Sequence, residues 1–182
     1  MANDKQTAVG SHNIQADGNN NNIIVDSLIV SGQRPLTHSL IYDLLGIVYP
    51  NSKSTNYSLQ DPVPMKDKLR FNNAMKYIYI IDNHSNDYAQ VDFVMKDYPD
   101  SENIIKHLRD MFLDVAEFDK DGYPCVSNGD NQLDSIKENL KETIVFDSHF
   151  DNEKYTDEQI EQFCIALIAC GISKCKILEK PA

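Results

Sequence analysis

The sequence lacks an apolar segment long enough to cross a bilayer. Its longest apolar run near the end, Ile165 to Ile172, is far shorter than the roughly 20 residues that a membrane-spanning helix needs. The stretch MANDKQTAVG has no apolar region of the kind found in a secretory signal. We therefore expect a cytoplasmic protein that does not enter a membrane.

Positive charge is also scarce. The chain has 17 Lys and Arg residues against 28 Asp and Glu residues, which gives a net charge of −11 and an isoelectric point near 4.7. Nucleic acids and anionic membranes attract concentrated Lys and Arg, and the sequence shows no such cluster. We expect no direct binding to nucleic acid.

Cysteine is rare and lacks the spacing of a metal site. The residues are Cys125, Cys164, Cys170 and Cys175, and no two of them form a CxxC pair. Three of them lie on or beside one apolar helix, so we expect them to pack as small hydrophobic side chains.

Motifs for phosphate binding, metal binding or nucleophilic catalysis are missing, including GxxxxGK[ST], GxGxxG, HExxH and GxSxG. The acidic stretch 117–122 resembles the start of a calcium loop. Its twelfth position is Asn128 rather than Glu, however, and Pro124 interrupts it. A solvated acidic turn is the expectation here.

The histidines are scattered, and two of them lie close to aspartates. His149 lies between Asp147 and Asp151, and His84 lies between Asp82 and Asp87. We expect both groups to be exposed turns. The sequence thus predicts no catalytic residue, no cofactor-binding residue and no metal ligand, and we do not expect an enzyme.

Apolar residues at helical spacing dominate the chain after residue 35 and predict a mainly α fold. We expect Ser101 and Thr156 to cap helices, the latter in a capping box with Gln159. Gly171 is expected to interrupt or bend the last helix. The expected helices cover 37–48, 69–81, 88–94, 101–115, 133–145 and the region after 156, with a long polar loop at 119–132.

The N-terminal part is different, because GSHNIQAD is followed by GNNNNIIVD, two similar stretches that each begin with glycine. They resemble two rungs of a β-solenoid, too few to enclose a core by themselves. Two interpretations stay open: a flexible linker with one strand packed on the helical domain, or strands paired between identical chains. We predict a polar tail with a short β segment over 1–34 and a helical domain over 35–182. The residues expected to mediate oligomerisation are Asn19, Asn20, Asn21, Asn22, Ile23, Ile24, Val25, Leu28, Ile29 and Val30.

Aromatic residues are concentrated between residues 71 and 93. Tyr77, Tyr79 and Tyr88 lie there together with Phe71 and Phe93. We expect most of this aromatic surface to be core. Any exposed part would suit a protein interface, where tyrosine is enriched, so the three tyrosines are the predicted partner interface.

Two stretches resemble a known family. They are KLRFNNAMKYIYIIDNHSNDYAQVDFVM, from Lys68 to Met95, and CIALIACGISKCKILEKP, from Cys164 to Pro181. Both are similar to the C-terminal domains of ABC-three-component systems, which are bacterial anti-phage operons with an SMC-like ABC ATPase. The resemblance implies a non-catalytic domain that couples an effector to its partners. Such domains commonly follow an effector domain, whereas here only the Asn-rich segment precedes.

The expected function is therefore an adaptor that self-associates and binds partner proteins, such as ABC ATPase and effector subunits, in a bacterial antiviral defence complex. An alternative is a structural protein of a virion or appendage, in which the β segment forms an oligomeric stalk. An uncharacterised enzyme is a third interpretation.

Overall fold

The computed structural model describes residues 36–48, 64–174 and 177–179 of the 182. The chain divides between Gln33 and Arg34, and every described residue belongs to the second part, Arg34–Ala182. The predicted β segment, with the asparagine run and the aliphatic residues up to Val30, lies outside the described residues. Its structure and its role in oligomerisation stay predictions.

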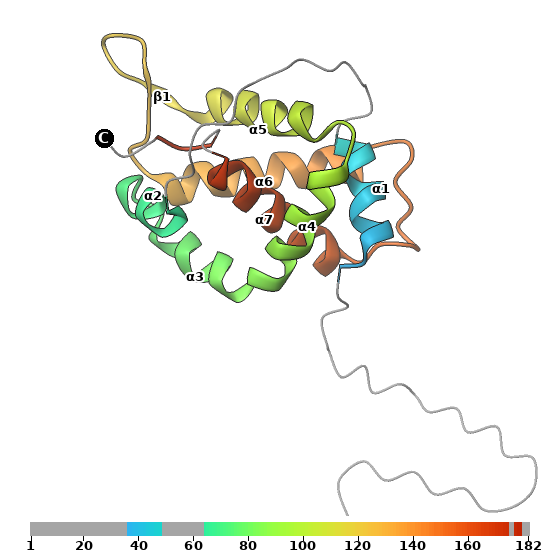
Figure 1. The fold of residues 1–182 in the computed structure, drawn as a ribbon. Coiled ribbons are helices and arrows are strands. Elements are labelled where there is room, and N and C mark those ends of the chain that lie inside the picture. Colours follow the sequence, from blue (N-terminus) through green and yellow to red (C-terminus); the bar gives the residue numbers. More distant parts are fainter. Residues whose placement is uncertain (1–35, 49–63, 175–176, 180–182) are drawn as a thin grey trace, which may run out of the picture. The chain divides into compact units, whose positions relative to one another are not determined.

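The described part of the chain is mainly helical, as expected (Figure 1). A single two-stranded antiparallel hairpin accompanies the helices there. In chain order the elements are α1 (His38–Val48), α2 (Met65–Phe71), α3 (Met75–Asn83), α4 (Ser85–Asp97), α5 (Ser101–Val115), β1 (Glu117–Phe118), β2 (Pro124–Cys125), α6 (Gly129–Val145) and α7 (Asp157–Ser173).

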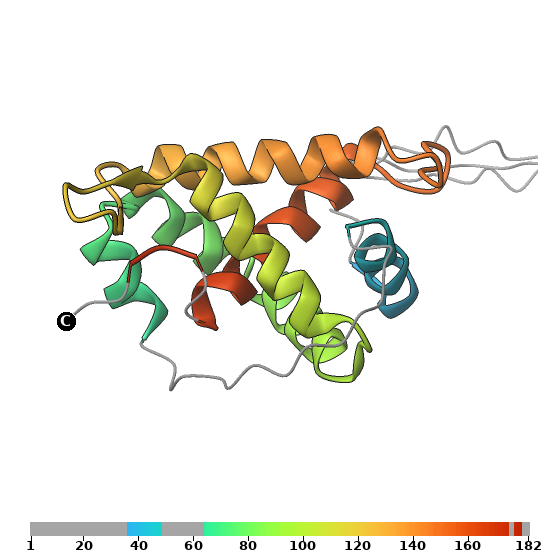
Figure 2. The same cartoon turned by 90° about the horizontal axis from the view of Figure 1, so that it is seen from above.

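Helix α7 forms the centre of the core. All of its residues from Gln162 to Ile172 are buried, so no side of this part of the helix faces solvent. A helix that is apolar on nearly every side is stable only when other elements surround it. Helices α2 to α6 all pack against α7, and Figure 2 shows α5 and α6 crossing it. The prediction that Cys164 and Cys170 are core residues is confirmed, since both are fully buried.

The start of α7 confirms the predicted capping box. The Thr156 hydroxyl accepts a hydrogen bond from the backbone N–H of Gln159 at 3.2 Å, and the Gln159 Oε1 accepts one from the Thr156 N–H at 3.2 Å. The helix continues past Gly171 to Ser173 rather than being interrupted there. A Cβ at Gly171 would lie 2.5 Å from Ile177 Cδ1, so glycine makes room for a later residue of the chain.

The apolar stripe expected over 69–81 is two helices instead of one. Helix α2 ends at Phe71, and Asn73 follows in the left-handed region with φ 53°, a conformation that asparagine tolerates better than most residues. The break turns Phe71 and Met75 toward solvent, with 51% and 50% of their surfaces exposed. The expected stripe places Phe71 and Met75 on one apolar face with Leu69 and Tyr77, and the expectation that this whole face is buried was wrong for these two residues.

Two other boundaries differ from the expectation. Helix α5 has Asp100 rather than Ser101 at its N-cap, without a side-chain cap bond. Helix α6 begins at Gly129 rather than Leu133, because the Asn128 side chain accepts a hydrogen bond from the Asn131 N–H at 3.1 Å. The expected long loop is thus shortened by this helical turn and by the hairpin that joins β1 to β2.

Candidate functional site

Three exposed apolar side chains lie around the break between α2 and α3. Phe71 ends α2, and Met75 and Tyr79 follow one helical turn apart on the same face of α3. Tyr79 is 70% exposed, more than either of the other two. The opposite face of α3 carries Tyr77, Ile78 and Ile81, which are buried in the core. We call Phe71, Met75 and Tyr79 the α2–α3 patch.

The three tyrosines predicted to contact partners occupy different environments. Tyr77 is fully buried, Tyr88 is partly buried against the core, and only Tyr79 is mainly exposed. A fully buried ring has no surface to offer a partner, so Tyr77 does not fit the predicted interface, and Tyr79 is the most exposed of the three. Tyr77 and Tyr79 both lie in α3, and helical periodicity by itself places Tyr77 on the apolar face with Ile78 and Ile81 and leaves Tyr79 off that face.

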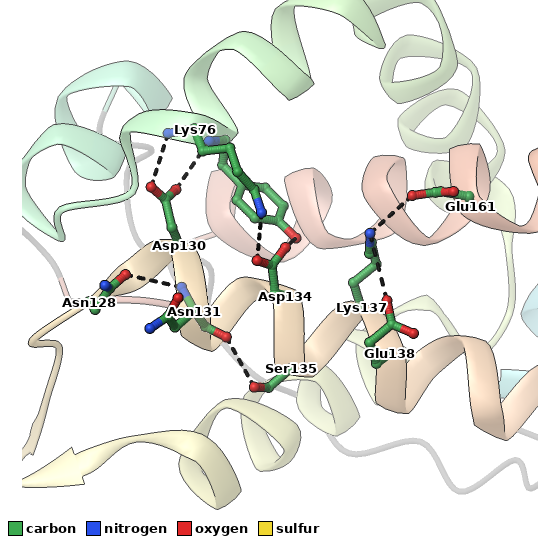
Figure 3. A network of polar contacts seen from close by, with 10 residues as sticks. Lys76, Asn128, Asp130, Asn131, Asp134, Ser135, Lys137, Glu138 and Glu161 are labelled. Atoms are coloured by element: carbon green, nitrogen blue, oxygen red, sulfur yellow. Dashed lines mark hydrogen bonds and ion pairs between the residues drawn. The ribbon is translucent and has the colours of Figure 1, made fainter.

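Helix α6 fixes the start of α3 through two aspartates (Figure 3). The backbone N–H groups of Lys76 and Tyr77 donate to the Asp130 carboxylate at 3.1 and 3.2 Å. Helix α3 has Ala74 at its N-cap and no side-chain cap of its own, so Asp130 supplies the missing acceptor from another helix. A carboxylate at this end also interacts favourably with the helix dipole.

Asp134, one turn further along α6, holds the side chains of the same two residues. Its carboxylate accepts from the Tyr77 hydroxyl at 3.1 Å and pairs with the Lys76 ammonium. Burial, followed by the charge of Asp134, raises the pKa of Tyr77 well above its ordinary value. The hydroxyl is therefore neutral and donates its proton to the bond, so α3 and its exposed patch are anchored firmly to α6.

A second polar group joins α6 to α7, and a separate pair lies at the junction of α3 with α4. Lys137 lies between Glu161, at 3.0 Å, and Glu138 (Figure 3). The hydrogen bond from Lys137 lowers the pKa of Glu161. His84 contacts Asp87 at 2.9 Å, and both side chains are largely buried, with 19% and 17% exposed. The turn expected at His84 lies between α3 and α4 and exposes Asp82, but the side chains of His84 and Asp87 are partly buried rather than exposed.

The two other acidic groups are turns at the surface. The Asp119 carboxylate accepts from the backbone N–H groups of Asp121 and Tyr123, and Gly122 adopts φ 81°. His149 is exposed and contacts Asp147. The hydrogen bonds from the backbone and side chain of His149 lower the pKa of Asp147. Within the described ranges, no three His, Cys, Asp or Glu side chains are placed to hold a metal ion.

A site that the sequence did not predict is built around Asn72, which is 1% exposed. Its side chain bonds the backbone of Glu179 in both directions: Nδ2 donates to the Glu179 carbonyl at 2.9 Å, and Oδ1 accepts from the Glu179 N–H at 2.8 Å. Its own carbonyl accepts from the Gly129 N–H at 2.9 Å. A Cβ at Gly129 would lie 2.3 Å from this carbonyl oxygen, so only glycine permits the approach.

The signal for this site in the sequence was slight. The pair Asn72–Asn73 interrupts an apolar stripe, and a buried asparagine must find hydrogen-bond partners. Nothing in the pattern identifies the partner, which lies 107 residues further along the chain.

No protein-family model matches the chain, and neither a curated protein nor a solved structure is significantly similar to it. Among the described helices, none combines the length and the apolar composition that crossing a bilayer requires.

Proposed function

We propose that this protein is a non-catalytic adaptor of a bacterial anti-phage defence complex, and that it binds a partner protein through the α2–α3 patch. The observation that carries the proposal is the exposure of Phe71, Met75 and Tyr79 on successive turns around one helix break. The patch falls within Lys68 to Met95, one of the two stretches that resemble the ABC-three-component domains. The partner is accordingly an ABC ATPase or effector subunit.

Side chains of this kind suit recognition of a protein surface. Aromatic residues and methionine are enriched in the centre of protein interfaces, where a few well-packed side chains supply most of the affinity. Single exposed apolar residues are ordinary on any protein, whereas neighbouring ones suggest an interaction site. Met75 and Tyr79 are neighbours on one face of α3, and Phe71 ends the helix that precedes it.

The patch is also held in a defined position. Asp130 and Asp134 anchor α3 through its backbone, the Tyr77 hydroxyl and Lys76. A surface that is already ordered loses less conformational entropy when a partner binds. Such a platform favours an adaptor that docks as a rigid body.

The charges around the patch are already paired within the domain. Lys66 pairs with Asp82 at 2.7 Å and Arg70 with Asp67 at 3.0 Å. The surroundings of the patch are thus close to neutral, so apolar contact rather than charge attraction supplies the binding energy. We expect the affinity for a partner to depend only weakly on salt.

The test is co-purification with the proteins encoded beside this gene, followed by calorimetric measurement of affinity. The variant Phe71→Ser/Met75→Ser/Tyr79→Ser should lose at least about 30-fold in affinity, as expected for removal of an interface hot spot. Phe146→Ser is the matched control, because Phe146 is 83% exposed at the end of α6, outside the patch. Unchanged affinity in a triple variant that keeps its helical circular dichroism would reject the patch as the interface.

Self-association through residues 19–30 is a separate part of the proposal. Light scattering on the full chain and on a variant without residues 1–34 compares their masses. We expect an oligomer that becomes smaller, or a monomer, after the deletion. A full-length chain that is monomeric at micromolar concentration would refute self-association through residues 19–30. It would not contradict partner binding by the α2–α3 patch.

A further inference from the structure

We infer that the site around Asn72 is a peptide-binding site, occupied here by the chain's own Ile177–Leu178–Glu179. The same three residues from a second copy of the chain are proposed to exchange into it. We call Asn72, Val126 and Gly171 the Asn72 site. It differs from both the α2–α3 patch and residues 19–30, so the inference goes beyond the adaptor function.

Recognition of the backbone comes from the Asn72 amide. One carbonyl and one N–H of Glu179 bond to it at 2.9 and 2.8 Å, which reproduces the bonding of a neighbouring β-strand. A further bond from Nδ2 to the Lys68 carbonyl at 2.7 Å identifies the nitrogen and fixes the orientation of the amide. The Asn72 amide is thus oriented to bind both backbone groups of one residue in a peptide.

Recognition of side chains comes from Val126 and Gly171. The Val126 N–H donates to the Glu179 carboxylate at 2.6 Å, a charge-assisted bond that selects an acidic residue. The missing Cβ of Gly171 leaves the space that Ile177 fills, and Ile177 and Leu178 are 0% and 2% exposed. The peptide that fits therefore has two apolar residues followed by an acidic residue.

The bound segment is held against its own conformational preference. Leu178 has φ 67°, a left-handed conformation that non-glycine residues seldom adopt and that persists only where surrounding contacts impose it. The contacts with the site therefore keep the segment in place. Strain of this kind is typical of ligand clamps and of segments that change position.

A second copy of the chain is the occupant that fits best. Every copy carries the matching segment, and exchange of an identical element between protomers preserves every contact of the original. The site would have the same hydrogen bonds and the same buried residues whichever copy fills it.

The experiment uses the full chain and a fluorescent peptide, KILEKPA, which has the sequence of residues 176–182. Ile177→Ala/Leu178→Ala weakens the internal occupant, and a peptide with the same two alanines is the matched control. Fluorescence anisotropy should show the variant binding KILEKPA at least tenfold more tightly than the unaltered chain does. Neither protein should bind the control peptide.

A variant that keeps its helical circular dichroism but binds neither peptide, or both equally, would overturn the inference. Should the variant fail to fold, hydrogen exchange on the unaltered chain tests whether residues 177–179 leave the site while the rest of the domain stays folded. The Glu179 N–H, bonded to the Asn72 side chain, should exchange at least 100-fold faster than the N–H groups in the middle of α7. Equal protection would mean that the segment leaves the site only when the whole domain unfolds, and would overturn the inference.

Discussion

Helix α7 and the Asn72 site adjoin each other at Gly171 and Ile177, yet different forces stabilise them. Helix α7 is held by burial of apolar side chains on nearly every side, a force without direction. The Asn72 site is held by hydrogen bonds from one buried amide to a segment 107 residues away. The core therefore depends on apolar composition, whereas the Asn72 site adds a specific partner for each donor and acceptor to the burial of Ile177 and Leu178.

The largest effect is expected from a cavity beside α7. Phe163 is fully buried, so Phe163→Ala should lower the free energy of unfolding by about 3–5 kcal/mol. Urea denaturation followed by circular dichroism measures it. Phe93→Ala is the control, since Phe93 is 63% exposed and should change stability by no more than about 0.5 kcal/mol. Similar losses for both phenylalanines would contradict the description of α7 as the centre of the core.

Removing the Asn72 amide should have the next largest effect. Asn72→Ala leaves the Glu179 N–H and the buried Lys68 carbonyl without this partner, and should lower stability by about 2–3 kcal/mol. Asn73→Gly is the neighbouring control. Glycine accepts φ 53°, and the Asn73 side chain makes an exposed bond at 3.3 Å, so we expect a change within about 0.5 kcal/mol. Chemical denaturation curves in which Asn73→Gly loses more stability than Asn72→Ala would contradict the claim that hydrogen bonds of the Asn72 amide stabilise the site.

The buried thiols make the core sensitive to alkaline pH. Burial raises the pKa of the Cys170 thiol from 9.0 to about 12. Above pH 9 the unfolded chain loses this proton while the folded chain keeps it, so stability falls as the pH rises toward 12. The expected slope is about 1.4 kcal/mol per pH unit for this thiol.

Measurements of unfolding free energy between pH 9 and 11 test this in the unaltered chain and in Cys170→Ala. The variant should have the shallower slope, because it lacks the thiol that ionises only in the unfolded state. Parallel pH profiles would show that Cys170 is accessible to hydroxide in the folded protein.

The smallest effect is expected at the start of α7. Thr156→Ala removes the N-cap hydroxyl of the capping box and should lower the free energy of unfolding by about 1 kcal/mol. Thr143→Ala is the control, because the Thr143 hydroxyl only bonds the Asn139 carbonyl one turn back on the exposed side of α6. We expect that change to be neutral or slightly stabilising, since alanine favours helices. Thermal unfolding that shows the same loss of stability for Thr156→Ala and Thr143→Ala would mean that the cap does not stabilise α7.

Much of the helical framework could be predicted from local patterns. Thr156 and Gln159 identified the start of α7, and the apolar stripe that ends before Pro50 identified α1. These features depend on residues a few positions apart, so a pattern of apolar spacing and capping residues contains the information. The aromatic region from Phe71 to Phe93 was also found, but the expectation that most of it is core was wrong, since Phe71, Tyr79 and Phe93 are exposed.

The early start of α6 depends on a local cap by Asn128 that apolar periodicity does not reveal. The α2–α3 break and the Asn72 site escaped prediction for a different, common reason. Each depends on polar groups whose partners lie in other elements: Asp130 caps α3 from α6, and Asn72 bonds Glu179. Periodicity describes one element at a time and says nothing about such partners.

Sequence alone thus determined that the chain is mainly helical, that α7 is buried and that Thr156 begins it, because apolar burial and capping are local or non-directional. Tertiary structure alone decided that Asp130 caps α3 from α6 and that residues 177–179 return to Asn72. Those outcomes require hydrogen-bond partners brought together from distant parts of the chain, and only the folded arrangement supplies their geometry.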